Sequence, residues 1–192
     1  PRRASRDRTP PVPAPYADCL LQAPRGRASQ LNAGAAKAHG KLLLFLHADS
    51  MLPPAFDQTL ESAVAGRTLA WGRFDVRIDS DNPLLAIVAG TLNLRSRVTG
   101  IATGDQALFT TRALFDQVGG FPLQPLMEDI AFCRRAKRIA APLCLRETVL
   151  TSGRRWTQQG VLRTVVLMWR LRLAYFLGAD PARLATRYRN VR

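Results

Sequence analysis

The sequence predicts an α/β domain in which a mostly parallel sheet is flanked by helices and followed by a helical tail. Segments of strand length alternate along the chain with segments of helical pattern, as expected for strands joined by crossover helices. The 192 residues are 47% apolar and 22% charged, which is typical of one globular domain. The run 42–46 holds five successive apolar residues between turn formers, which indicates a strand buried on both faces in the middle of such a sheet.

The first half of the chain contains two expected helix and strand pairs. The alanine-rich segment 27–38 suits a short helix that Gly40 closes, and it leads into the strand 42–46. A second helix is expected after Pro53 and Pro54, ending at residue 65. Residues 69–78 alternate apolar and polar side chains in their second half, which favours a strand with one wet face.

The second half continues the alternation. A helix is expected over 83–97, and the glycine-containing turn 100–104 leads into the short apolar strand 107–110. After a glycine and proline break at 119–122, residues 128–140 suit a helix and residues 143–150 a further strand.

The two ends differ in character from the predicted α/β domain, residues 16–156. Residues 1–15 are rich in Arg and Pro with little to bury, so we expect a disordered arm. The helical segment 157–192 contains the nearly all-apolar stretch 161–177, which is interrupted by three arginines. Such a helix either packs on the domain or lies at a membrane surface with its guanidinium groups reaching the headgroups.

The balance of charge favours anionic partners. The chain has 28 Lys and Arg against 14 Asp and Glu, a net charge of +14, and Arg binds phosphate through a rigid pair of donors. A basic nucleic-acid-binding module is one alternative, but the arginines are spread evenly and no nucleic-acid-binding motif occurs, so we expect no nucleic acid. The three cysteines have neither metal-ligand spacing nor an even count, which favours free thiols and a cytoplasmic location.

His47 and Asp49 are the first candidates for chemistry. They follow the predicted strand 42–46, and the carboxyl ends of strands in open α/β sheets bind ligands. In extended geometry both side chains point to the same side, where they could share one cation or one phosphate-bearing ligand. The alternative is structural: Asp49 caps the next helix and His47 ends the strand.

Four further groups of chemically distinctive residues follow a fixed order with this pair. Arg25-Gly26-Arg27 with Asn32 and Gly34 precede it, and Gly104-Asp105-Gln106, Glu128-Asp129 and Arg154-Arg155-Trp156 come after it. Taken together from about residue 17 to 189, the set resembles the inverting glycosyltransferases of family 2, which have the GT-A fold, and in particular a compact bacterial subgroup.

This resemblance implies a glycosyl-transfer reaction and a role in it for each group of residues. Asp49 would ligate a divalent cation that bridges the nucleotide diphosphate of the sugar donor, with His47 as a second ligand, which suits Mn²⁺ better than Mg²⁺. Asp129 would be the general base that takes the proton of the acceptor hydroxyl, and Glu128 would position the acceptor. The alternative for both acids is that they complement the dipole of the helix that they begin.

The remaining residues are assigned to substrate binding by the same resemblance. Arg25, Arg27, Asn32 and Gly34 would reach the nucleotide, as would Arg154 and Arg155 through the diphosphate. Gly104, Asp105 and Gln106 would line the sugar pocket, and Trp156 the acceptor side.

The chain departs from the family pattern at its start. Members of the family begin with a strand and an acidic segment that binds the nucleotide, and no part of residues 1–16 is similar to them. We therefore expect the first strands of the GT-A sheet to be missing, and an inactive truncated transferase is a further alternative. The expected partners are a nucleotide diphosphate sugar, an unknown acceptor and, peripherally, the inner face of a membrane.

Overall fold

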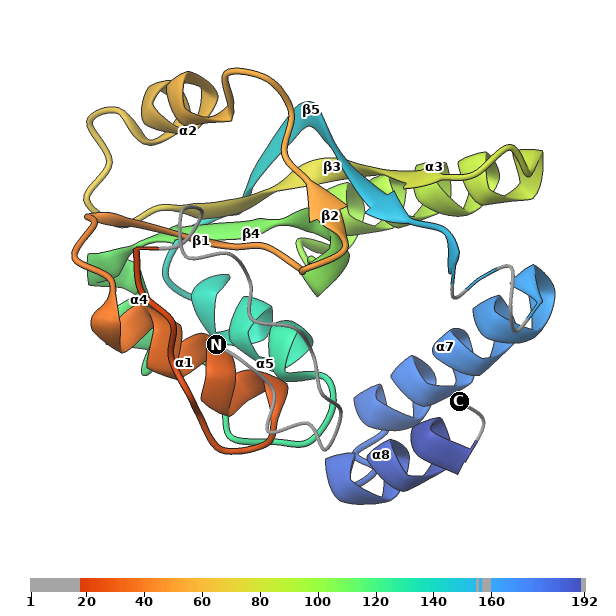
Figure 1. Ribbon diagram of the computed structural model, residues 1–192. Helices are drawn as coiled ribbons and strands as arrows, with labels where there is room; N and C mark the ends of the chain where they lie inside the picture. Colours follow the sequence, from red (N-terminus) through yellow and green to blue (C-terminus); the bar gives the residue numbers. More distant parts are fainter. Residues whose placement is uncertain (1–17, 155, 157–159, 191–192) are drawn as a thin grey trace.

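The protein is an α/β domain with a mixed five-stranded sheet between helices (Figure 1). The computed structural model describes residues 18–154, 156 and 160–190. The arm predicted for residues 1–15 and the role predicted for Arg155 lie outside the described residues.

The sheet is mixed, so the prediction of a mostly parallel sheet was wrong. Its strands have the spatial order β1-β4-β3-β5-β2, in which only β3 and β5 pair in parallel and the other three pairings are antiparallel. Hydrophobic periodicity identifies a strand but not its direction, and a helix followed by a loop such as 100–107 can lead into a strand of either direction. The five strands are β1 (Leu42–Phe45), β2 (Ser50–Met51), β3 (Trp71–Asp79), β4 (Leu108–Thr111) and β5 (Leu143–Ser152).

β1 has a different position from the one predicted. Within the described part of the chain it pairs only with β4, as an edge strand, and of its four side chains only Leu43 is fully buried. Leu43 faces one layer of helices while Leu42 and Leu44 face the other, so the continuous apolar run reflects a strand covered on both faces rather than a central one.

Most helices begin where the sequence predicts and several end earlier. The helix predicted over 128–140 ends at Ala136, and neither α4 nor β2 was predicted. α3 begins at the predicted residue and ends two residues later than predicted. The Asn82 side chain accepts a hydrogen bond from the Leu84 amide, and Gly100 closes the helix at φ 63°. The α-helices are α1 (Arg27–Lys37), α2 (Phe56–Val64), α3 (Pro83–Thr99), α4 (Arg112–Val118), α5 (Glu128–Ala136), α7 (Val161–Phe176) and α8 (Pro181–Asn190), with a 3-10 turn η2 (Gly104–Gln106).

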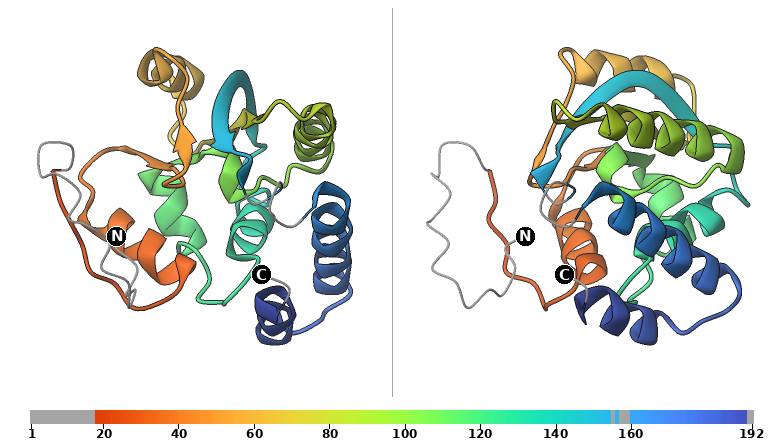
Figure 2. Two further views of the ribbon diagram at one scale, coloured as in Figure 1. Left: turned by 45° about the vertical axis from the view of Figure 1, so that its right-hand side comes forward. Right: turned by 90° about the vertical axis from the view of Figure 1, so that its right-hand side faces the viewer.

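Helices cover both faces of the sheet (Figures 1 and 2). α1, α4 and α5 pack on the face that carries Leu43, Trp71 and Leu108, and this layer holds the largest core. On the opposite face, Phe74 and Phe109 pack edge to face under α2, at a centroid distance of 6.0 Å. Together the two layers fix the loops at the ends of the strands.

The C-terminal helices pack on the domain. Leu171 of α7 and Leu184 of α8 are buried in the same core as α1, α4 and α5. Among the described helices, none is both long and apolar enough to cross a bilayer.

Candidate functional site

Five charged or titratable side chains from four separate segments meet at one edge of the sheet. The Arg27 guanidinium pairs with Glu128 at 3.0 Å (Nε to Oε1) and lies 2.5 Å from Nε2 of His47. The other ring nitrogen of His47, Nδ1, lies 3.1 Å from Oδ1 of Asp105. We call Arg27, His47, Asp105, Glu128 and Asp129 the site cluster, and it unites four of the groups that the sequence singled out.

The Asp129 carboxylate is held in the site cluster by two backbone amides. Its Oδ2 accepts a hydrogen bond from the Gly104 amide at 3.0 Å, and its Oδ1 accepts one from the Ile130 amide at 2.8 Å. Asp129 is half-buried, so its carboxylate is held in place while a substrate could still reach it. The contact also ties the start of α5 to η2.

Position 104 requires glycine because two side chains of the site cluster lie against its backbone. A Cβ at this position would overlap the Arg27 guanidinium and the His47 ring. The backbone of Gly104 therefore lies directly against two members of the site cluster, and only glycine leaves room for them.

Two strained backbone positions border the cluster. Met127 (φ 65°) precedes Glu128 and Asp129, and Ala107 (φ 45°) follows η2. Left-handed conformations of residues other than glycine cost about 1–3 kcal/mol each and gather at functional sites. The turn at η2 is fixed by Thr103 and Gln106, each of which bonds the backbone of the other.

Burial and ion pairing shift the pKa values of Glu128 and Arg27. Glu128 is only 1% exposed, and burial raises its pKa although the charge of Arg27 opposes the shift. For Arg27, burial lowers the pKa, but Glu128, Asp129 and Asp105 outweigh that effect and raise it. Arg27 therefore stays charged, and the buried Glu128 keeps its proton to a higher pH than an exposed glutamic acid does.

Arg95 and Arg172 are site residues that the sequence analysis did not identify. Burial, and after it the nearby charge of Arg172, lower the pKa of Arg95 to about 10, and burial also lowers the pKa of Arg172. Asp129 attracts both guanidinium groups. Nε and Nη2 of Arg95 and Nε of Arg172 are buried without a hydrogen-bond partner in the described part of the chain.

A sequence signal for Arg172 does exist. Met168 and Tyr175, one turn before it and one after, pack against the core, so Arg172 lies on the side of α7 that faces the domain. An arginine on the inner side of an amphipathic helix needs a polar environment, which makes it a candidate for a ligand contact.

The two predicted metal ligands, His47 and Asp49, have different surroundings. Asp49 is exposed in the turn after β1, and its carbonyl accepts a hydrogen bond from the Ser152 amide at 3.1 Å. Both ring nitrogens of His47 are already engaged, with Arg27 and Asp105, so His47 does not fit the role of metal ligand in this arrangement. Among the described residues, no three His, Cys, Asp or Glu side chains gather into a metal site.

The amide side chains predicted to touch substrate are used internally. Asn32 clamps the backbone of Phe121, donating to its carbonyl at 2.8 Å and accepting from its amide at 2.9 Å. Gln106 is fully buried and its side chain donates to Ser96, so a contact with the sugar does not fit its position. Both residues support loops that carry the site cluster.

The other predicted binding residues lie apart. Arg25 is exposed before α1, and Gly34 accepts a hydrogen bond from Ala38 at the end of α1. Arg154 is also exposed, and the Trp156 side chain packs in the small apolar cluster around Ile78 rather than beside Asp129.

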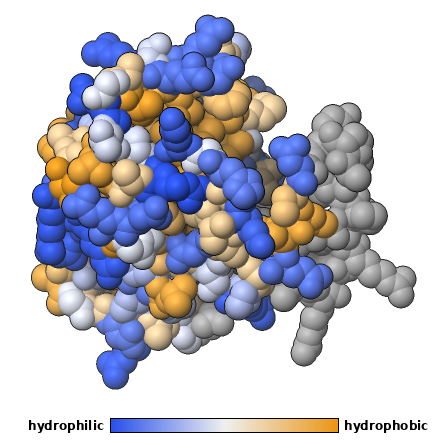
Figure 3. All heavy atoms as spheres, turned by 90° about the vertical axis from the view of Figure 1, so that its left-hand side faces the viewer, coloured by the Kyte–Doolittle hydropathy of each residue, from blue (hydrophilic) through white to orange (hydrophobic). Residues whose placement is uncertain are grey.

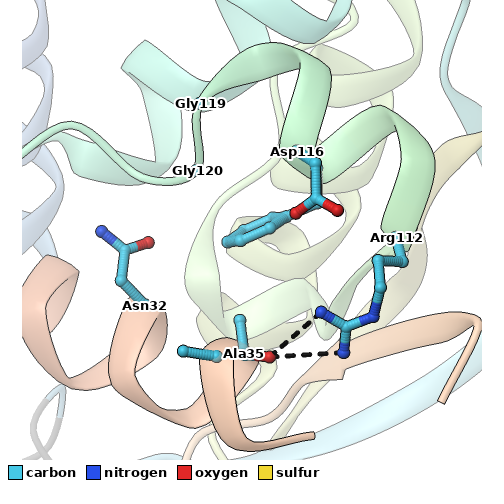
Figure 4. A pocket seen from close by; sticks show the side chains of 8 residues that line it. Asn32, Ala35, Arg112, Asp116, Gly119 and Gly120 are labelled. Atoms are coloured by element: carbon cyan, nitrogen blue, oxygen red, sulfur yellow. Dashed lines mark hydrogen bonds between the residues drawn. The ribbon is translucent and has the colours of Figure 1, made fainter. Parts of the chain in front are cut away.

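A pocket of about 290 Å³ lies between α1 and α4 (Figure 4). It is lined by Asn32, Ala35 and Arg112, and the Arg112 guanidinium donates to the Ala35 carbonyl at 3.3 Å. Arg112 thereby binds the carboxyl end of α1, and the pocket includes none of the site cluster.

Comparison with known proteins does not extend this description. No known family model, curated protein or solved structure matches the chain. The candidate site is therefore defined by its own geometry.

Proposed function

We propose that this protein is a metal-dependent inverting glycosyltransferase, which moves a sugar from a nucleotide diphosphate sugar to a hydroxyl group of an acceptor. One observation carries the proposal: segments at residues 27, 47, 104–105 and 128–129 meet in one charged cluster. In this reaction the acceptor hydroxyl loses a proton while the nucleotide diphosphate leaves. A site for it therefore needs a fixed carboxylate that accepts the proton and, close by, fixed positive charges that stabilise the diphosphate.

Asp129 is the base in this proposal. The acceptor oxygen forms its bond to the anomeric carbon from the face opposite the nucleotide, and its proton passes to the Asp129 carboxylate. The bond between the anomeric carbon and the diphosphate oxygen breaks, and its electrons leave with the nucleotide diphosphate. Hydrogen bonds from the Gly104 and Ile130 amides orient the carboxylate for this step.

Asp49 is the protein ligand that would hold a divalent cation. An exposed carboxylate suits Mg²⁺ or Mn²⁺ sites in which substrate phosphates complete the coordination. When bound, the cation would neutralise charge on the leaving diphosphate. His47 acts differently: through Arg27 and Asp105 it joins two segments of the site cluster.

Arg95 and Arg172 supply positive charge near Asp129. Two like charges that are partly buried and short of hydrogen-bond acceptors are stabilised by an anion. We assign them to oxyanions of the substrate, the role that the resemblance to family 2 glycosyltransferases implied for Arg154.

The proposal is tested by calorimetry of the full chain with UDP or GDP, with and without Mn²⁺. Asp49→Ala is expected to weaken the Mn²⁺-dependent binding of the nucleotide, whereas Asp129→Asn leaves it nearly unchanged. Asp57→Asn, an exposed acid in the first turn of α2, is the matched control and should have no effect.

Two results would contradict the proposal. One is nucleotide binding that is indifferent to Mn²⁺ in every variant. The other is binding to nucleic acid that falls steeply with salt and ignores Mn²⁺, which would favour the nucleic-acid-binding alternative.

A further inference from the structure

Two helices carry apolar stripes that face away from the domain. On α3 the exposed large apolar residues form two pairs, Leu84 with Ile87 and Leu94 with Val98, which are two helical turns apart and lie opposite the buried Leu85 and Ala89. On α7 they recur every three or four positions along the helix, opposite the buried Thr164 and Leu171. The stripes consist of Leu84, Ile87, Leu94 and Val98 on α3 and of Leu162, Val166, Trp169, Leu173 and Phe176 on α7.

The two stripes belong to one side of the molecule. α3 and α7 are in contact, and in the right-hand view of Figure 2 they lie one above the other toward the viewer. We call this surface the α3–α7 face. On the opposite side of the molecule, Figure 3 shows hydrophilic and hydrophobic side chains interspersed.

The stripes are unusually exposed for large apolar side chains. Trp169 is 68% exposed and Val98 is 78% exposed. Single exposed apolar residues are ordinary on protein surfaces, but two adjoining rows of them mark an interaction site.

The charge of the α3–α7 face is positive. Neither helix contains an Asp or a Glu, and two of their five arginines, Arg163 and Arg170, contribute to this face. The other three do not: Arg95 and Arg172 are largely buried beside the site cluster, and Arg97 pairs with Asp75. Arg163 and Arg170 are exposed, and on a helical projection both lie about 90° from the middle of the α7 stripe, along one of its borders. An apolar surface bordered by arginines is complementary to a bilayer whose headgroups are anionic.

We infer that the α3–α7 face binds the surface of an anionic lipid bilayer, with both helices lying in the plane of the interface. The apolar stripes enter the boundary between headgroups and acyl chains, and Arg163 and Arg170 reach lipid phosphates. A second copy of this chain fits less well, because it would bring two faces of the same charge together. Nucleic acid would leave the aliphatic stripes without an apolar partner.

The experiment uses the full chain with vesicles of phosphatidylcholine alone or mixed with phosphatidylglycerol. We expect co-sedimentation with the mixed vesicles only, together with a blue shift of Trp169 emission. Trp71, which is fully buried, should contribute an unchanged signal.

Three variants separate the parts of the inference. Leu173→Ser combined with Val166→Ser should reduce binding to the mixed vesicles at least about tenfold, because the apolar insertion is lost. Arg163→Gln and Arg170→Gln should each weaken it about fivefold, because each guanidinium near an anionic surface contributes about 1 kcal/mol. Leu123→Ser, at a loop position that is 79% exposed, is the matched control and should bind like the unmodified chain.

Equal binding by the Leu173→Ser, Val166→Ser variant and the control would overturn the inference, as would no binding to mixed vesicles. Dimerisation that disappears in the same variant would assign the face to a second copy instead. Because none of these residues belongs to the site cluster, nucleotide binding should be unchanged in every variant. A failure here is therefore distinct from a failure of the proposed function.

Discussion

Two groups of arginines and carboxylates occur in this protein, and they are organised differently. In the first, Arg73 lies fully buried in β3, pairs with Asp75, and donates from its terminal nitrogens to the carbonyls of Asn93 and Leu145. Arg97 of α3 donates to the other oxygen of Asp75 at 2.6 Å. This group joins β3, α3 and β5.

The second group, the site cluster with Arg95 and Arg172, is not completed by the protein. The first group leaves one buried donor, Nε of Arg73, without an acceptor among the described residues, whereas Arg95 and Arg172 together leave three such donors. Glu128 is buried beside Arg27. The protein itself nearly completes the first group, whereas the proposed function assigns the unpaired donors of the second group to an anionic ligand. The difference teaches that pairing, and not charge alone, distinguishes a structural arginine from a binding one.

The largest expected effect tests the function of the second group. Asp129→Asn should lower the rate of sugar transfer by about 10²- to 10⁴-fold, because the amide cannot accept the proton of the acceptor. Thermal denaturation should change little, since an amide oxygen can still accept from Gly104. Transfer at the unmodified rate would remove Asp129 from the mechanism.

The next effect tests the first group. Arg73→Met should lower the free energy of unfolding by about 3–5 kcal/mol, because Asp75 loses a buried partner. Arg77→Met, at an exposed position of the same strand, should lower it by less than about 0.5 kcal/mol. Urea denaturation of both variants measures the difference, and equal stability would mean that the pair is not structural.

A smaller effect tests the close approach at η2. Gly104→Ala should cost about 1–3 kcal/mol, because the added methyl group displaces Arg27 and His47. Gly90→Ala on α3, where a Cβ meets no atom within 4 Å, should instead stabilise the protein by about 0.5–1 kcal/mol. Opposite shifts in the melting temperature are expected, and equal shifts would exclude the steric explanation.

Arg95→Met should change the free energy of unfolding in a different direction from Arg73→Met, which distinguishes the two groups. Removing a guanidinium whose donors are unpaired should leave the free energy of unfolding unchanged or raise it by about 1 kcal/mol, in contrast to Arg73→Met. Calorimetry should show weaker binding of UDP or GDP with Mn²⁺. A strong loss of stability would place Arg95 with the structural arginines.

The smallest effect is a dependence on pH. Because the pKa of Glu128 is raised, the native state holds its proton to a higher pH than the unfolded chain does. Stability from this residue is therefore present at low pH and is lost as the pH rises from the ordinary pKa of glutamic acid through the raised one. Glu128→Gln should flatten that part of the curve of melting temperature against pH, and an unchanged curve would assign the dependence to another group.

The sequence by itself predicted most of the helices and strands and a set of candidate site residues. Local signals suffice for α1, β1, the second half of β3, α3 and α7, because periodicity, caps and glycines act within a few residues. The polar groups at 47–49, 104–106 and 128–129 stood out for the same local reason, as breaks between apolar segments.

Only the tertiary structure decided the direction of the strands and the partner of each charge. That β4 lies antiparallel between β1 and β3 depends on contacts far apart in the chain, as does the pairing of Arg27 with Glu128 across a hundred residues. The same applies to His47, whose ring is occupied by its neighbours, and to Arg95 and Arg172, which come from different helices. Charge on a residue is a local property, but whether that charge is paired depends on which distant segments the fold brings beside it.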